Sequence, residues 1–270
     1  MMDLFQYDFV TKALLGALFA AITAGIAGTY IVSRRMVFLS GGITHASFGG
    51  IGIGYFLGIN PMLGAAVFGV LSALGIEYLS GKQKIREDSA IGIFWAFGMA
   101  IGVIFIYLTP GYTPDLMGYL FGSLLTVTSG DIIVLGFLSV VLVVYFSLYY
   151  RTLIYLSYDE TFARTYSSRV DLFKYITTAL MALTIVLNIR MAGIILVLSL
   201  LTIPPNIAML FTRSYSKIII YSILFGFVGT IIGFAISYFV GIPVGATIIF
   251  TLAILWSISK ILVTISAKNK

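Results

Sequence analysis

Residues 37–55 read VFLSGGITHASFGGIGIGY, an apolar, glycine-rich run that carries His45, the single histidine of the 270-residue chain. Its six glycines leave little bulk around the imidazole, so neighbouring helices can approach closely and backbone is exposed where a ligand passes. An ionisable group inside a membrane is costly and usually faces a protein interior or a water-filled path. His45 is therefore a functional candidate. The alternative is a histidine that is hydrogen-bonded between packed helices.

The composition is that of a polytopic membrane protein. Sixty per cent of the residues are hydrophobic and only 10% are charged, which excludes an ordinary soluble domain. A membrane span needs about 20 apolar residues, so the chain has room for about eight to ten spans. The absence of cysteine excludes disulfides and thiolate metal sites.

The placement of the basic residues predicts the topology. With nine spans, all 16 Lys and Arg residues except Lys12 and Arg190 fall on one side of the membrane. Because basic connections stay in the cytoplasm, the N-terminus is expected outside and the C-terminus inside. The candidate spans lie near residues 10–32, 39–58, 61–79, 89–109, 131–150, 172–189, 191–211, 218–240 and 243–265.

Two further segments interrupt the regular pattern of spans. Residues 109–131 hold two prolines and an amphipathic middle, which predicts a short helix at 115–125 against the outer mouth; an ordinary surface loop is the alternative. In the seventh span, residues 201–206 contain Pro204 and Pro205, which predict a break that frees backbone carbonyls. Such breaks often line transport paths, although a simple kink is as common.

The most polar connection is residues 151–171, RTLIYLSYDETFARTYSSRVD. Residues 159–164 are predicted to form a short helix whose first turn carries an acidic pair, where the helix dipole favours negative charge. Tyr158, Phe162 and Tyr166 are interleaved with charge, which indicates a docking surface for a cytoplasmic partner. An amphipathic patch lying on lipid headgroups is the alternative.

Several chemistries lack their sequence signatures. No GxxxxGK[ST] loop, GxSxG elbow or HExxH motif occurs, so the chain does not bind ATP in the P-loop manner. Ser40 or Ser47 beside His45 leaves an intramembrane hydrolase as an alternative, without a recognisable oxyanion arrangement. All ten carboxylates fall at span ends or in connections, which argues against a proton-driven carrier.

Taken together, six blocks of this sequence resemble the permease subunits of the ABC importers for zinc, manganese and iron, such as the zinc uptake permease. The resemblance covers essentially the whole chain. Each block is modest alone, and their order and spacing make the set specific. The blocks are residues 34–55, 87–93, 115–122 with Asp131 following, 158–164, 190–196 with Pro204 following, and 238–247.

The second helix departs from the family pattern at one position. The family typically carries an aspartate four residues before the histidine, and Gly41 stands there in this chain. The resemblance therefore gives a metal-facing role to His45 alone, with Gly41, Thr44, Gly49 and Pro204 as candidates to line the path. A single imidazole does not choose among zinc, manganese and iron, of which zinc is expected first.

The resemblance also implies an architecture. It implies an all-α, multi-pass protein of the bacterial cytoplasmic membrane, with about eight to nine transmembrane helices. The expected fold is that of the type II, cobalamin-importer-like permeases, in one domain over residues 1–270. This chain would have no ATPase site of its own, because a separate subunit hydrolyses ATP. It would bind no cofactor, because the divalent metal ion is its transported substrate.

The implied partners are a second copy of the chain, two cytoplasmic ABC ATPase subunits, an extracellular or periplasmic metal-binding protein and the lipid bilayer, but no nucleic acid. A stand-alone secondary carrier or channel is the alternative, and metal uptake without any ATPase would favour it. The resemblance places coupling to the ATPase within the 151–171 loop, at Tyr158, Asp159, Glu160, Phe162, Ala163 and Arg164.

Overall fold

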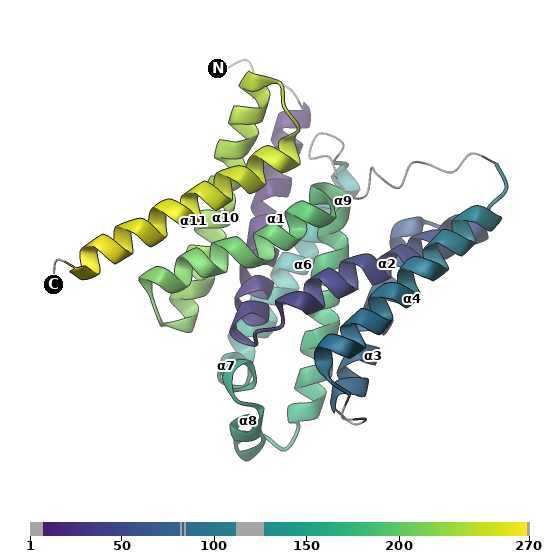
Figure 1. The fold of residues 1–270 in the computed structure, drawn as a ribbon, viewed down its shortest axis with the longest axis horizontal. Helices are drawn as coiled ribbons and strands as arrows, with labels where there is room; N and C mark the ends of the chain where they lie inside the picture. Colours follow the sequence, from purple (N-terminus) through teal and green to yellow (C-terminus); the bar gives the residue numbers. More distant parts are fainter. Residues whose placement is uncertain (1–7, 82, 84, 112–126, 269–270) are drawn as a thin grey trace. The chain divides into compact units, whose positions relative to one another are not determined.

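The computed structural model describes residues 8–81, 83, 85–111 and 127–268, which form helices joined by short turns (Figure 1). No strand occurs among these residues, which confirms the predicted all-α fold. The short helix predicted at 115–125 lies outside them. The helices are α1 (Asp8–Ser33), α2 (Val37–Leu57), α3 (Pro61–Gly81), α4 (Glu87–Leu108), α6 (Ser129–Leu148), α7 (Tyr150–Tyr158), α8 (Glu160–Tyr166), α9 (Val170–Phe211), α10 (Tyr215–Val240) and α11 (Val244–Lys268).

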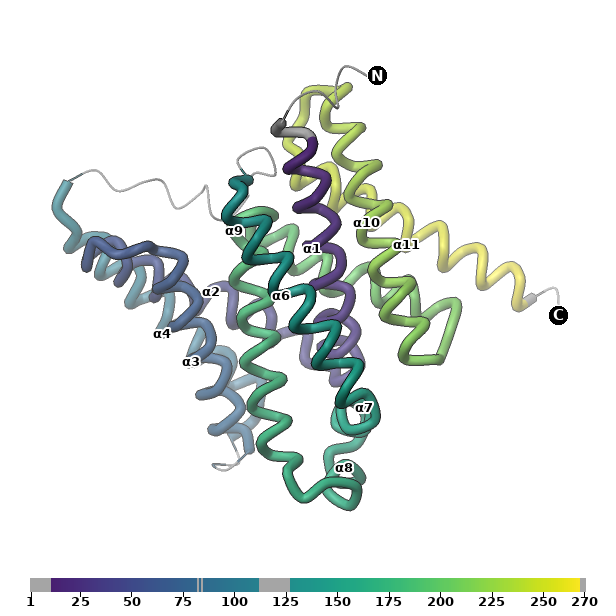
Figure 2. Tube along the Cα trace, turned by 180° about the vertical axis from the view of Figure 1, so that it is seen from behind, coloured from purple at the N-terminus to yellow at the C-terminus, as the bar shows by residue number. Residues whose placement is uncertain are grey.

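The chain divides into two compact units. The first unit holds α1, α6, α10, α11 and the part of α9 from Met191 onward. The second unit holds α2, α3, α4, α7, α8 and α9 up to Arg190. In the first unit α1 packs against α6 and α10, and α10 packs against α11 (Figure 2). In the second unit α2 packs against both α3 and α4 (Figures 1 and 2). One permease domain over residues 1–270 stays a prediction.

Glycines bring the backbones of α2, α3 and α4 into direct contact. A Cβ added at Gly50 would lie 2.0 Å from the carbonyl oxygen of Gly64 on α3. A Cβ added at Gly52 would lie 2.5 Å from the carbonyl oxygen of Gly102 on α4. Between helices in lipid, close van der Waals packing replaces the hydrophobic effect as the source of association. The glycine-rich sequence of α2 is thus what fixes it between its two neighbours.

Among the described residues, seven helices are long and apolar enough to cross a membrane, fewer than the eight or nine expected. The first difference is α2, where six glycines, three hydroxyl-bearing Ser and Thr residues and His45 lower the hydropathy. The second is α9, in which two helices meet at a kink at Gly193, so that one 42-residue element stands where two spans are predicted at 172–189 and 191–211. At about 1.5 Å per residue, each of the two helical parts of α9 is long enough to cross a bilayer core of about 30 Å.

Large apolar side chains cover the outside of the helices. Phe38 is 77% exposed, Tyr107 is 89% exposed and Phe239 is 73% exposed. A soluble monomer rarely leaves such side chains in water. With seven candidate spans, this surface confirms that the chain is an integral membrane protein.

The break predicted within the seventh span is absent, and the kink of α9 lies instead near the boundary between the two predicted spans 172–189 and 191–211. The expected site was residues 201–206, but α9 continues as a helix through Pro204 and Pro205. The residue with non-helical angles inside α9 is Gly193, at φ 72° and ψ 164°. This backbone conformation is open to glycine and strained for any residue with a Cβ. Gly193 therefore decides where α9 bends.

The two prolines are accommodated by contacts within the first unit. Pro205 has no N–H to donate to the carbonyl of Leu201 four residues earlier. That carbonyl packs against Gly28 of α1, where an added Cβ would lie 2.3 Å from its oxygen. The ring of Pro204 faces Gly226 of α10, with Cγ 3.6 Å from the position of a Cβ there. The freed Leu201 carbonyl is thus buried against α1, not exposed to a path.

Candidate functional site

His45 lies in the middle of α2 with its side chain partly buried. The indole of Trp95, on α4, stacks on the imidazole with ring centroids 4.2 Å apart and planes within 8°. Nδ1 of His45 is buried and has no hydrogen-bond partner. Buried polar atoms are nearly always hydrogen-bonded, so this nitrogen is an exception. The alternative of a histidine hydrogen-bonded between packed helices is not realised at Nδ1.

Gly41 lies one helical turn before His45, where the related permeases are expected to carry an aspartate. A Cβ added at Gly41 would meet a single atom within 4 Å, Cζ3 of Trp95, at 3.7 Å. This is ordinary van der Waals contact. The structure therefore leaves room for a side chain at position 41, and glycine is not required there by packing.

The other path candidates are engaged in packing. Thr44 is buried, and its hydroxyl donates to the carbonyl of Gly41 at 2.7 Å. Gly49 is close to α4, with an added Cβ 3.0 Å from the carbonyl oxygen of Gly98. Pro204 belongs to the first unit, whereas the three α2 positions belong to the second. Of the sequence-predicted path residues, the structure thus places Gly41 beside the imidazole stack, and Thr44 and Gly49 in tight helix contacts.

The serines proposed for a hydrolase do not bond to the histidine. The Ser40 hydroxyl donates to the carbonyl of Val37 at 2.6 Å, and the Ser47 hydroxyl donates to that of Thr44 at 2.7 Å. Both protons are used within α2, so His45 has no serine proton to abstract in this geometry. Among the described residues, no three His, Asp or Glu side chains gather as a metal site. The site rests on one imidazole.

The predicted helix in the 151–171 connection is present as α8. Asp159 is its N-cap and accepts a hydrogen bond from the backbone N–H of Phe162 at 3.1 Å. The Thr161 hydroxyl also donates to the same carboxylate. These two hydrogen bonds, the Thr161 one foremost, lower the pKa of Asp159 below its ordinary value. Asp159 thus serves as the capping residue that starts α8.

The two faces of α8 differ. Phe162 is 51% exposed, and Tyr158 just before the helix is 59% exposed. Ala163 is 1% exposed and faces the interior. The ring of Tyr155 on α7 packs edge-on against Phe162 and Tyr166, with centroids 4.9 and 5.0 Å away. Tyr158, Phe162 and Tyr166 thus form an exposed aromatic surface, while Ala163 packs α8 against the interior.

The charged residues of α8 bond within the chain. Arg164 pairs with Glu160 at 2.8 Å and with Asp171, in the first turn of α9, at 2.6 Å. The two carboxylates raise the pKa of Arg164. Glu160 also pairs with Lys174 of α9, and that lysine pairs with Glu77 of α3. The sequence predicts Glu77 at the end of a span, whereas the structure buries it within α3 as the one charged residue of that helix, which is the signal that identifies such residues. Lys174 was not predicted as a site residue either.

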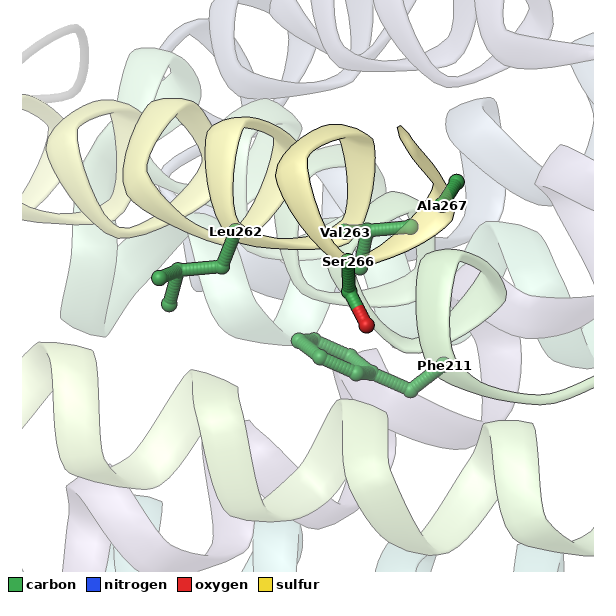
Figure 3. Close-up of a pocket in the computed structure, with 5 residues that line it drawn as sticks. All are labelled: Phe211, Leu262, Val263, Ser266 and Ala267. Carbon is green, nitrogen blue, oxygen red and sulfur yellow. The ribbon is translucent and has the colours of Figure 1, made fainter. Parts of the chain in front are cut away.

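A separate apolar pocket lies in the first unit, between the end of α9 and α11 (Figure 3). Its volume is about 440 Å³, and the Ser266 hydroxyl points toward the Phe211 ring. None of its lining residues carries a charge or an imidazole, so it offers nothing that binds a metal ion. The lining residues are Phe211, Leu262, Val263, Ser266 and Ala267.

Comparison with known proteins gives a consistent result across the chain. The profile of the ABC 3 transport family matches residues 6–263. An uncharacterized membrane protein of Synechocystis sp. is 38% identical over 96% of this chain and 92% of its own length. The manganese transport system membrane protein MntC of Listeria monocytogenes is 34% identical over 95% of this chain and 91% of its own. Among solved structures, PsaBC from Streptococcus pneumoniae in complex with Fab superposes with a TM-score of 0.83 at 30% identity, covering 95% of this chain and 92% of that chain.

Proposed function

This chain belongs to the ABC 3 transport family, and on that premise we propose that it is the permease subunit of an ATP-driven importer for a divalent transition metal. The observation that carries the proposal is the family match over residues 6–263, which includes both the His45 helix and α8. ABC permeases are transport subunits, and the ATP is hydrolysed by separate subunits. The partners are therefore two cytoplasmic ATPase subunits and an extracellular metal-binding protein.

Manganese is the substrate we propose first, ahead of the zinc that the sequence favoured. A relative that is 34% identical over nearly the whole chain is named as a manganese transport protein. A single imidazole leaves the other coordination positions of the ion to water, and oxygen donors suit manganese. Zinc and iron are the competing substrates.

His45 is proposed as the transit point for the ion. Because Nδ1 is buried, Nε2 is the nitrogen that a passing metal ion would meet. The neutral ring coordinates through a lone pair, and an incoming dication itself keeps the ring neutral. One imidazole holds an ion weakly, which suits a path that must also release it. In a two-fold homodimer each such residue appears twice, so the path would present a pair of histidines.

The aromatic surface of α8 is proposed to dock on the ATPase. Tyr158, Phe162 and Tyr166 are exposed, and aromatic residues are enriched in the binding centres of protein interfaces. Ala163 faces inward, and Glu160 and Arg164 bond to α9 or within α8. Their proposed part in coupling is therefore to hold α8 in place, while the aromatic residues make the contact.

The proposal is tested by reconstituting the permease in liposomes with the ATPase and the metal-binding protein of the same importer. Uptake of manganese should require ATP and both partners, and should exceed uptake of zinc and iron supplied at equal concentration. Uptake that proceeds equally well without the ATPase would favour a stand-alone carrier and refute the proposal. Uptake confined to zinc would correct the substrate and leave the importer function standing.

A further inference from the structure

A chain of ion pairs joins α8 to the membrane helices of the second unit. Arg164 of α8 contacts Asp171 of α9 at 2.6 Å and Glu160 at 2.8 Å. Glu160 contacts Nζ of Lys174, on α9, at 2.9 Å. Lys174 in turn contacts Glu77 of α3 at 2.7 Å. Five charged side chains thus connect α8 and the start of α9 with α3, which is distant from them in the sequence, and α8 lies beside the first turns of α9 (Figure 2).

Burial within this chain of contacts increases from α8 toward α3. The side chain of Arg164 is 49% exposed and that of Glu160 is 31% exposed. Lys174 is 12% exposed and Glu77 is 4% exposed. The second oxygen of Glu77 accepts a hydrogen bond from the Thr178 hydroxyl at 2.9 Å. The deep end is therefore a fully partnered, desolvated pair, while the α8 end is open to solvent.

The depth of the pair decides what it can contribute. Exposed ion pairs contribute little to stability, and buried pairs are no more stabilising than apolar residues of similar size. Buried pairs instead fix one arrangement of the elements they join, because either charge alone is costly to leave without its partner. Glu77 is the only charged residue of α3, and Lys174 is the only charged residue of the α9 stretch 172–189. Lys174 contacts Glu160 of α8 directly, and Glu77 is connected to α8 through Lys174.

We propose that Glu77 and Lys174 are positioning residues that transmit the movement of α8 to α3 and α9. This inference rests on the proposed function, in which α8 docks on the ATPase. The exposed aromatic surface of α8 receives the ATPase, and the opposite, charged side passes the displacement through Lys174 to both membrane helices. Binding of the ATPase and coupling of its hydrolysis to transport thus belong to different residues.

The geometry predicts a graded response to substitution. Lys174→Met leaves Glu77 and Glu160 both without their shared cation, so it should be the most damaging change. Glu77→Gln keeps the contact of Lys174 with Glu160 and should be milder. Lys174→Arg keeps the charge and should retain most of the coupling. The double variant Glu77→Gln/Lys174→Met removes both buried charges, so it should regain stability but not coupling.

The experiment measures metal ions imported per ATP hydrolysed by the reconstituted complex, with manganese as the transported ion. Co-purification of the ATPase and thermal stability of the permease are measured on the same preparations. We expect normal ATPase co-purification in all four variants, and a roughly 2- to 30-fold lower ratio in Lys174→Met and in the double variant. The double variant should be more stable than Lys174→Met.

Two outcomes distinguish this inference from the proposed function. A double variant that is stable, binds the ATPase and imports metal with the wild-type ratio would overturn the positioning role of the pair and leave the importer intact. A wild-type complex without ATP-dependent uptake would instead overturn the proposed function, and this inference with it.

Discussion

Replacement of Gly50 by alanine tests the contact on which the position of α2 depends. The new methyl would lie 2.0 Å from the carbonyl oxygen of Gly64, whereas ordinary van der Waals contact begins at 3.4 Å. The obstacle is backbone, so no side chain can rotate away, and α2 and α3 must separate by roughly 1 Å, a gap that forfeits up to about half of the dispersion energy of their contacts.

The expected magnitude follows from two opposing terms. Overpacking of a close contact costs about 1–3 kcal/mol, and the upper end applies where backbone must move. The higher helix propensity of alanine returns at most about 1 kcal/mol. Gly50→Ala should therefore lower the free energy of unfolding by about 2 kcal/mol. Gly92→Ala is the matched control, because an added Cβ at Gly92 of α4 meets no atom within 4 Å.

The assay is unfolding of the purified permease in mixed micelles by a denaturing detergent. Gly50→Ala should unfold at a lower detergent fraction than the wild type, and Gly92→Ala at the same or a higher one. Equal stability of the two variants would refute direct backbone contact between α2 and α3. A loss confined to Gly92→Ala would contradict the packing of this unit altogether.

Three further substitutions test other parts of the structure. Gly193→Ala should destabilise the permease by about 1–3 kcal/mol in the same unfolding assay, because φ 72° is strained for alanine; unchanged stability would show that α9 does not bend there. Phe162→Asp should weaken ATPase co-purification by roughly thirtyfold in affinity, with the exposed Thr165→Ala as control; equal recovery of ATPase with both variants would remove the aromatic surface from the interface. Gly41→Asp should fold normally, since only Trp95 lies near, and should bind manganese with higher affinity in equilibrium binding; unchanged affinity would place position 41 away from the path.

The fold was largely predictable because hydrophobicity and glycine spacing report directly on membrane helices. The apolar segments predicted from residue 10 to residue 265 correspond to helices, and the glycines of α2 other than Gly41 do mark close helix contacts. Proline was the misleading signal. Pro204 and Pro205 are tolerated because Gly28 lets α1 cover a freed carbonyl, and such a compensation on a distant helix is not visible locally.

The candidate site was predictable in part. His45 was found because it is a lone ionisable group in an apolar run, but its stack on Trp95 depends on how α2 packs against α4. The pairing of Lys174 with both Glu160 and Glu77 depends on tertiary contacts between residues that are up to 97 positions apart in the chain. Sequence identifies which charges exist, and only the fold decides which of them meet.

We have proposed that a divalent metal ion passes His45 on its way through the permease. The most direct measurement is ATP-dependent manganese uptake by the reconstituted complex carrying His45→Asn, with ATPase activity recorded in parallel and Gly92→Ala as the control variant. We expect uptake to fall sharply in His45→Asn while the ATPase still binds and hydrolyses ATP, and Gly92→Ala to transport normally. Manganese flux near the wild-type rate in His45→Asn, with ATPase activity intact, would contradict it.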